Sequence, residues 1–375
     1  MRAYGVCNTP TSAISPIVGA VFWYTPCVET DDAMKWCCSL LLAGLFTTSS
    51  WAVLTPVDDV PVRTPANFDP MVPSPLVIAL HGYTGNGDAA NGLLGLWPEA
   101  EARGFLYASP TGSTNLWGAN YWNATDACCD FLGENIDHIG YLMDLVASIQ
   151  SRYNVDSSHI HFIGHSNGGF MCHALACARP EVIASATSIA GAVWNDPAQC
   201  AAEQPVHVLQ VHGTSDDTVL YSGGSFGSSQ YPGAQATVDQ WAQQNGCQAM
   251  GTQIVDTIDF DGYVGGSETD VYRSSACEPG GSVELWKCNG SGHGFSVTAA
   301  GKAAVFSYML EHSKSMVSAC PADITGDQVV DIHDLLLLLE QWGIAGDTTS
   351  DIDASGMVDV DDLLLLIVAW GPCSS

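Results

Sequence analysis

One serine lies in a pattern that makes hydroxyl groups reactive. Residues 159–170 read His-Ile-His-Phe-Ile-Gly-His-Ser-Asn-Gly-Gly-Phe, a strand-like run followed by Gly-x-Ser-x-Gly and a helix-like segment. Small residues at Gly164 and Gly168 permit a tight turn, which lifts the Ser166 hydroxyl clear of a sheet at the start of a helix. The alternative is an ordinary glycine-rich turn. The pattern therefore predicts that Ser166 is a nucleophile.

A nucleophilic serine needs a base, and the base needs a carboxylate that orients it. A strand-like run ends at His-Gly-Thr-Ser-Asp-Asp, in which Asp216 is the predicted acid and Asp217 the competitor. A later strand-like run ends at Cys-Asn-Gly-Ser-Gly-His-Gly-Phe, where His293 lies between two glycines on a loop. We expect His293 to take the proton of Ser166 and to return it to the leaving alcohol.

An ester carbonyl attacked by serine becomes an oxyanion, which backbone N–H groups stabilise. One predicted donor is Asn167, the residue after the nucleophile. The other comes from Leu-His-Gly-Tyr-Thr-Gly at residues 80–85, with Tyr83 as the preferred donor and Thr84 as the alternative.

Several aromatic residues have two interpretations. Trp117, Trp122 and Trp194, with Tyr121, either line a cleft for an aromatic ring or a polymer, or pack in the core. We predict Trp117, Trp122 and Trp194 as substrate-binding residues.

An internal repeat occupies the C-terminal part of the chain, with two acidic copies offset by 28 residues. Calcium takes six to eight oxygen ligands, and a 12-residue loop supplies them from positions 1, 3, 5, 7, 9 and 12. The predicted ligands are Asp323, Thr325, Asp327, Val329 (carbonyl), Asp331 and Asp334 in the first copy, and Asp351, Asp353, Ser355, Met357 (carbonyl), Asp359 and Asp362 in the second. Gly356 suits the sharp turn at position 6, where the first copy has Gln328. The alternative is a pair of solvated acidic turns that cap helices.

These residues must be positioned by the surrounding elements. Strand-like and helix-like segments alternate, which predicts an α/β fold with a mostly parallel sheet covered by helices on both faces. The predicted strands are 75–80, 105–109, 159–163, 206–211 and 283–287, and the predicted helices are 137–152, 168–178, 233–245 and 299–312.

The chain divides into an N-terminal extension with a signal peptide (1–52, signal 34–52), a catalytic domain (53–318) and a C-terminal domain (319–375). Met34-Lys35, a short apolar run and Ser50-x-Ala52 have the form of a secretory signal, and the run is too short for a membrane span. Export implies an oxidising compartment, and the ten cysteines after residue 52 suit disulfides. We expect the adjacent Cys128 and Cys129 to pair with different partners.

The charge excludes some partners. Forty acidic residues face ten basic ones, for a net charge of −30. Such a polyanion is repelled by nucleic acid and by anionic membrane surfaces. Eleven of the acidic residues and no Lys or Arg lie in residues 319–375.

Taken together, Leu80-His-Gly, Trp122-Asn-Ala-Thr-Asp-Ala-Cys-Cys-Asp, Gly-His-Ser-Asn-Gly-Gly, His212-Gly-Thr-Ser-Asp-Asp-Thr-Val and the late Gly-His-Gly resemble the secreted esterase family that includes polyhydroxybutyrate depolymerases and feruloyl or acetyl-xylan esterases. The resemblance covers nearly all of residues 70–312. It implies an α/β-hydrolase fold and a serine carboxylic-ester hydrolase that acts on polymer-linked esters through an acyl-enzyme, without a catalytic cofactor. Members often have Gly-His-Thr-Trp where this chain has Gly-His-Gly-Phe. A polyhydroxybutyrate depolymerase is the runner-up, and an inactive hydrolase-fold scaffold is the alternative of another class.

Residues 320–373 resemble type I dockerins, which have paired calcium loops, each followed by one helix that ends in Trp-Gly. The resemblance implies a small all-α domain with structural calcium. It also implies a cohesin or cell-surface scaffold as partner, and a clasp between Cys320 and Cys373.

Overall fold

The computed structural model describes residues 54–314, 320–325, 329–346, 348–353 and 355–373. The predictions for residues 1–52, including the signal peptide, lie outside the described residues. So do the domain boundary predicted at 318/319 and the predicted ligand Asp327.

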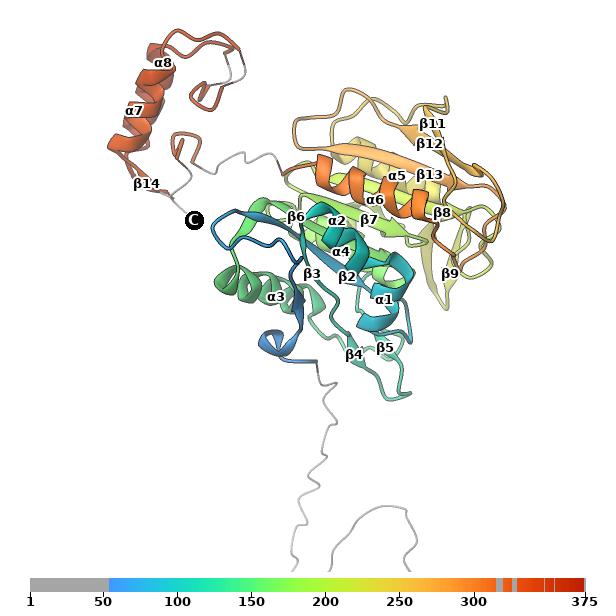
Figure 1. Ribbon diagram of the computed structural model, residues 1–375. Helices are drawn as coiled ribbons and strands as arrows, with labels where there is room; N and C mark the ends of the chain where they lie inside the picture. The colour runs from blue at the N-terminus through green and yellow to red at the C-terminus, as the bar shows by residue number, and fades with distance from the viewer. Residues whose placement is uncertain (1–53, 315–319, 326–328, 347, 354, 374–375) are drawn as a thin grey trace, which may run out of the picture. The chain divides into compact units, whose positions relative to one another are not determined.

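A nine-stranded sheet forms the centre of residues 54–314, in the order β1-β3-β2-β6-β7-β8-β13-β12-β11 (Figure 1). Its six central strands are parallel, and β1, β12 and β11 add antiparallel edges. The bounds are β1 Val62–Arg63, β2 Ser74–Leu80, β3 Leu106–Ala108, β6 Val155–His165, β7 Ser185–Ile189, β8 His207–Gly213, β11 Asp256–Ile258, β12 Thr269–Arg273 and β13 Ser282–Cys288. The prediction of a mostly parallel sheet is confirmed.

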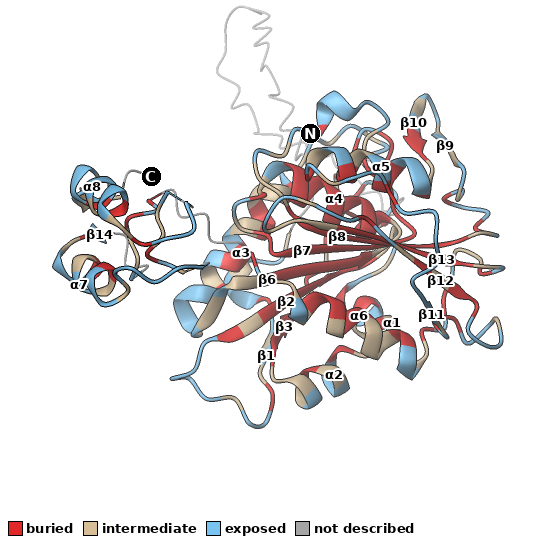
Figure 2. Cartoon of the chain, turned by 90° about the horizontal axis from the view of Figure 1, so that it is seen from above, coloured by how far each residue is buried: buried red, intermediate tan, exposed pale blue. Residues whose placement is uncertain are grey.

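Helices cover both faces of this sheet (Figure 2). Alternate side chains of β2 enter the two cores, because successive strand residues point to opposite faces. Leu76 and Ile78 join the core under α3, α4 and α5, whereas Val77 joins the core under α1, α2 and α6. The bounds are α1 Gly87–Leu94, α2 Leu96–Arg103, α3 His138–Arg152, α4 Asn167–Ala178, α5 Ala234–Gln244 and α6 Ala299–Glu311, with 3₁₀ turns at Val57–Asp59 and Pro197–Gln199.

Two short hairpins project from this framework. They are formed by β4 (Ser113–Thr114) with β5 (Asn120–Tyr121), and by β9 (Gly223–Phe226) with β10 (Ser229–Pro232). None of the helices in the described part of the chain is both long and apolar enough to cross a bilayer.

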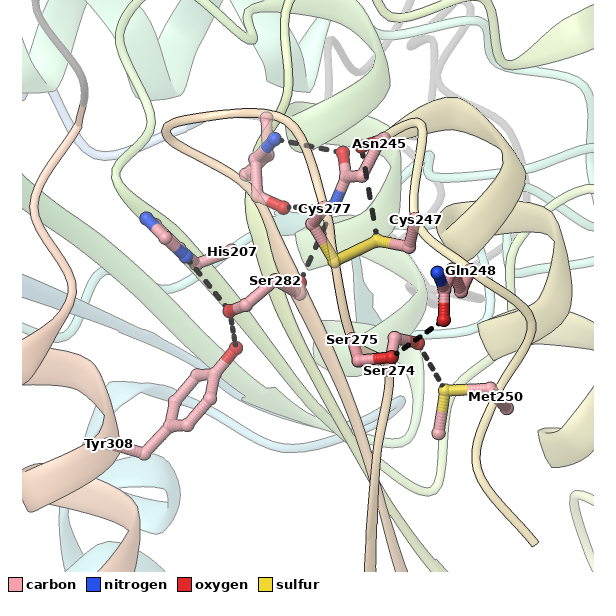
Figure 3. The surroundings of a disulfide bond; sticks show 11 residues. His207, Asn245, Cys247, Gln248, Met250, Ser274, Ser275, Cys277, Ser282 and Tyr308 are labelled. Atoms are coloured by element: carbon pink, nitrogen blue, oxygen red, sulfur yellow. Dashed lines mark hydrogen bonds between the residues drawn. A yellow bond between two sulfur atoms is a disulfide. The ribbon is translucent and has the colours of Figure 1, made fainter.

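Three disulfides join residues that are distant in the sequence, namely Cys177–Cys200, Cys247–Cys277 and Cys320–Cys373. Cys247–Cys277 connects the loop after α5 to the loop before β13. Beside this bond, Asn245 Nδ2 donates to Val206 O at 2.7 Å, so the disulfide and the amide both fix the segment that follows α5 (Figure 3).

One cysteine prediction is wrong. Cys128 and Cys129 are bonded to each other rather than to different partners. The segment around them is a tight turn, in which Thr125 and Cys128 exchange backbone hydrogen bonds and Trp122 O accepts the N–H of Cys129, and no other described cysteine is a partner of either sulfur. Among the described cysteines, Cys172 and Cys288 are buried thiols.

The C-terminal segment has a core of its own. Its helices are α7 (Ile332–Glu340) and α8 (Val360–Val368), each preceded by one acidic loop. The expected all-α character needs a correction, because β14 (Val329–Val330) pairs with β15 (Gly371–Pro372). The Cys320–Cys373 bond connects the two ends of this segment.

Candidate active site

Ser166 occupies a strained turn between β6 and α4. Its φ is 54° and its ψ is −119°, which L-residues seldom adopt and which marks a functional constraint. A Cβ at Gly164 would lie 2.3 Å from the Gly168 carbonyl carbon, and one at Gly168 would lie 2.3 Å from Leu80 O. Only glycine fits at both positions, so the strand and helix approach closely enough to expose the serine.

The structure brings three of the predicted side chains into one hydrogen-bonded row. His293 Nδ1 lies 2.8 Å from Asp216 Oδ2, and His293 Nε2 lies 3.0 Å from Ser166 Oγ. A carboxylate only accepts hydrogen bonds, so Nδ1 carries the proton and Nε2 accepts from the serine hydroxyl. This tautomer is the one in which an imidazole can act as a base toward serine.

Asp216 is held as an ionised acceptor. Its Oδ1 accepts the N–H groups of Thr218 and Val219 at 2.9 and 2.8 Å. Burial alone would raise the pKa of Asp216, but hydrogen bonds from His212 and His293 outweigh it and hold that pKa well below its usual range. The competitor Asp217 is exposed and bonds to Thr218 Oγ1, so it does not orient the base.

A second histidine, which sequence reasoning missed, touches the base. His165 Nε2 donates to His293 O at 2.8 Å, and the two ring centroids are 4.9 Å apart. Burial lowers the pKa of His165 to about 4, so this side chain is neutral near pH 7. Its place directly before Ser166 was the only signal available in the sequence.

The predicted oxyanion donors lie beside the nucleophile. A Cβ on Gly82 would be 3.3 Å from Ser166 Cβ, so the loop of residues 80–85, called the oxyanion loop below, lies against the serine. The Thr84 N–H donates to Asn120 O at 2.8 Å, whereas the Tyr83 N–H has no acceptor among the residues that the structure describes. This pattern favours Tyr83 over Thr84 as a donor to substrate.

Two side chains hold the oxyanion loop in shape. His81 Nδ1 donates to Gly82 O at 2.7 Å, and its Nε2 accepts the Gly112 N–H at 3.0 Å. Asn167 uses its side chain for both backbone polar groups of Trp122, at 2.7 and 2.9 Å. Asn167 is the first residue of α4, where backbone N–H groups have no intrahelical acceptor, so its N–H is available to a ligand.

The aromatic residues separate into core and surface. Trp122 is fully buried and donates Nε1–H to His81 O at 3.1 Å, so its assignment to an open cleft is wrong: the ring supports the oxyanion loop from inside. Trp117 is 65% exposed, and Trp194 is partly buried against the core.

A different aromatic row, not predicted, begins at the oxyanion loop. The Tyr83 ring lies 5.4 Å from Phe131, and Phe131 lies 6.1 Å from Phe226 of the β9–β10 hairpin. Phe131 is 44% exposed, so this row offers apolar surface that starts at the loop carrying Tyr83, whose Gly82 lies against Ser166. The motif at residues 80–85 marked Tyr83 only as an oxyanion donor, and no motif marks Phe131 or Phe226, because the three residues come from segments far apart in the sequence.

In the second acidic loop, Asp351, Asp353 and Asp362 each direct an oxygen to within 4.8 Å of the others. Residues 319–375 contain no Lys or Arg to neutralise them. Ser355 Oγ bonds to Met357 O, and Asp359 is the N-cap of α8. Converging oxygens without a basic partner suit a hard divalent cation.

The first acidic loop has the same framework where it is described. Asp334 is buried and accepts the N–H groups of Thr325 and Asp331 at 2.8 Å each. In the second loop Asp362 accepts the N–H groups of the corresponding Asp353 and Asp359, at 3.1 and 2.8 Å. Burial would raise the pKa of Asp334, but its backbone donors outweigh it and lower that pKa. Asp323 is partly buried and Val329 exposed, and Asp331 is the N-cap of α7.

Comparisons with known proteins point to esterases. The chain is 27% identical over 240 residues to feruloyl esterase B of Piromyces equi, which covers 62% of this chain and 42% of that protein. It is 28% identical over 274 residues to poly(3-hydroxyalkanoate) depolymerase C of Paucimonas lemoignei, covering 64% and 58%. The chain thus spans less than two thirds of the length of either relative.

Among solved structures, an acetyl xylan esterase from Aspergillus awamori aligns with a TM-score of 0.46 and 19% identity, covering 66% of this chain and 93% of that one. No protein-family model matches the chain.

Proposed function

We propose that the chain is a secreted serine carboxylic-ester hydrolase of the feruloyl or acetyl-xylan esterase type, acting on polymer-linked esters. The observation that carries this proposal is the unbroken row from Ser166 through His293 to Asp216, beside a Tyr83 N–H that no described residue accepts. An inactive scaffold would have no use for a strained serine with an aligned base.

The geometry supports a two-step reaction. Ser166 Oγ attacks the ester carbonyl carbon while His293 Nε2 takes its proton, and the oxyanion accepts the N–H groups of Tyr83 and Asn167. His293 then protonates the leaving alcohol, which departs and leaves an acyl-serine. A water molecule gives its proton to His293 and attacks the acyl carbon, and the proton returns to Ser166 as the acid is released.

The substrate class is proposed from two sources. Relatives named as feruloyl esterases support an ester on a plant polysaccharide. The aromatic row of Tyr83, Phe131 and Phe226 is suited to contact with an aromatic acyl group. The poly(3-hydroxyalkanoate) depolymerase among the relatives keeps a polyester as the runner-up.

Labelling with a fluorophosphonate tests the nucleophile directly. Wild-type protein should be labelled and Ser166→Ala should not, while Ser188→Ala, a buried serine of β7, retains labelling as the control. Folded wild-type protein that resists the probe would refute the esterase and favour the scaffold. Release assays on methyl ferulate, acetylated xylan and polyhydroxybutyrate then separate the substrate classes.

For the C-terminal segment we propose structural calcium in both acidic loops. The convergence of Asp351, Asp353 and Asp362 supports this, as does the same capping geometry at Asp334 in the first loop. A carboxylate oxygen has more than one lone pair, so an aspartate can cap a helix and bind an ion.

A docking role is proposed for the outer faces of α7 and α8. Their exposed apolar residues include Leu336, Leu339, Leu364 and Val368, the last 85% exposed. Apolar surface gathered on two short helices is typical of a partner-binding face. A cohesin or a cell-surface scaffold is the proposed partner, and secretion is consistent with the disulfides.

Calorimetry on the full chain tests the calcium proposal. We expect about two ions to bind, and Asp351→Asn should remove the second-loop event. Asp361→Asn is the matched control, since this acid lies one residue from Asp362 but outside the cluster. Equal heats for both variants, or none for wild type, would contradict the proposal.

A further inference from the structure

Behind Asp216 the interior holds a row of polar side chains that the triad chemistry does not use. His212 and Gln210 lie two residues apart on β8, with His173 of α4 and Trp241 of α5 beyond them. Each of these four is at most 1% exposed. Burial of polar groups is unfavourable unless each finds a hydrogen-bond partner.

Their contacts form one continuous chain. Trp241 Nε1 lies 3.0 Å from His173 Nδ1, and His173 Nε2 lies 2.9 Å from Gln210 Oε1. Gln210 Nε2 lies 3.1 Å from His212 Nδ1. His212 Nε2 reaches Val219 O at 2.8 Å and Asp216 Oδ2 at 3.4 Å.

The chemistry of the end residue sets every proton in the chain. An indole nitrogen only donates, so His173 Nδ1 is an acceptor and its proton is on Nε2. That proton requires an acceptor, which places the oxygen of the Gln210 amide toward His173 and its nitrogen toward His212. His212 Nδ1 is then an acceptor, and its Nε2–H points at Val219 O and Asp216.

We infer that the chain from Trp241 through His173 and Gln210 to His212 positions the triad carboxylate, so that Gln210 and His212 are positioning residues for the ester hydrolysis proposed above. Asp216 is then held on both oxygens, by backbone donors on Oδ1 and by His293 and His212 on Oδ2.

The hydrogen-bond chain also connects the elements that carry Ser166 and Asp216. His173 lies on α4, the helix that begins directly after Ser166, and Gln210 lies on β8, the strand that leads to Asp216. Gln210 Nε2 donates in addition to Gly191 O at 2.9 Å, in the loop after β7. The buried amide of Gln210 therefore connects the helix after the nucleophile, the strand before the acid and the loop after β7.

The test compares variants that remove or keep the donor at Asp216. His212→Leu should lower kcat about tenfold, the loss expected for one hydrogen bond to a charged acceptor, with KM unchanged. His212→Gln restores an N–H and should recover most of this loss.

Trp241→Phe removes only the indole donor at the other end of the hydrogen-bond chain and should lower kcat about threefold. Trp286→Phe is the control, because the Trp286 indole is also buried but bonds to Glu284, outside this hydrogen-bond chain, and its loss should leave kcat unchanged.

The pH–rate profile separates positioning from simple packing. Among the described residues, His165 and His212 face the Asp216–His293 pair, and Tyr221 and Cys288 lie in turn against His212. The N–H of His212 withdraws charge from the oxygen that bonds His293. Its loss in His212→Leu leaves the imidazolium better stabilised, so the acid limb of kcat/KM should move to higher pH.

The possible failures are distinguishable. A wild-type protein without activity or labelling refutes the proposed function. In that case, the titration of His293 followed by NMR still tests the hydrogen-bond chain from Trp241 to His212. The inference is overturned if wild type is active and both His212→Leu and Trp241→Phe match it in kcat and in the acid limb of the kcat/KM profile. A loss in His212→Leu that His212→Gln does not recover also overturns it. If His212→Leu fails to fold, Trp241→Phe and His212→Gln decide the outcome.

Discussion

His165 donates its Nε2–H to the main-chain carbonyl of His293 at 2.8 Å. The residue directly before the nucleophile thereby holds the loop that carries the base, across 128 positions of sequence. The strand end that presents the serine and the loop that presents the imidazole cannot shift independently of each other.

We predict that His165→Leu lowers kcat about fivefold to tenfold, since one buried hydrogen bond contributes roughly 1 kcal/mol and each 1.4 kcal/mol is a factor of ten. The base loop loses its anchor, whereas Ser166 keeps its turn. Steady-state kinetics on a small ester measures the change. His159→Gln alters a partly exposed histidine elsewhere on β6 and should match wild type; an equal loss there would contradict the assignment.

Gly168→Ala should destabilise the protein by about 1–3 kcal/mol, because a Cβ there would lie 2.3 Å from Leu80 O and the backbone must move. Activity should fall with it, since the oxyanion loop begins at Leu80. Urea unfolding measures the stability. Gly92→Ala is the control: it lies within α1 with nothing within 4 Å, so it should be neutral or stabilising by up to about 1 kcal/mol. The interpretation fails if both variants behave alike.

Acid should destabilise the fold through its buried histidines. Burial lowers the pKa of His161 and His207 to about 3 and that of His173 to about 4. The folded state keeps these rings neutral, whereas the unfolded chain binds protons below about pH 6.5. Their stabilising contribution is therefore complete above pH 6.5 and is lost progressively as the pH falls toward 3 to 4.

Urea midpoints at pH 7.5 and pH 5 check this expectation, with the lower value at pH 5. His161→Gln should reduce the difference between the two midpoints, because one of the depressed groups is gone. His333, 69% exposed in its side chain, serves as the comparison, and His333→Gln should leave the pH dependence as in wild type. Midpoints independent of pH in wild type would rule the explanation out.

Phe131→Ala should impair aromatic esters selectively. Its ring connects Tyr83 to Phe226 beside the serine, so its loss should raise KM for methyl ferulate about fivefold, in line with about 1 kcal/mol for an aromatic contact. Small acetate esters should be hydrolysed at the wild-type rate. Trp97→Ala, which removes an exposed aromatic on α2, is the control. An equal effect on both esters would mean that Phe131 supports the loop and does not contact the acyl group.

Sequence patterns predicted the elements that have strong periodicity. The five predicted strands and four predicted helices all occur, with shifted ends. β7 was missed because Ser185-Ala-Thr-Ser-Ile has few apolar residues, yet all five are buried between β6 and β8. The antiparallel edges, α1 and α2 were also missed, since glycines and charged residues interrupt their patterns.

The sequence by itself determined the nucleophile turn and the candidate acid and base, because Gly-x-Ser-x-Gly and polar residues after strand ends are local signals. It likewise determined the paired acidic loops, since a repeat needs no fold to be seen. Only the tertiary structure showed that Asp216, and not Asp217, bonds to the base, and that Trp122 is buried in the core. It also showed that Cys128 is bonded to Cys129. The hydrogen bonds that connect Trp241 to Asp216 through His173, Gln210 and His212 are likewise visible only in the fold. These outcomes depend on which side chains meet across strands and helices distant in sequence, and local pattern carries no information about such contacts.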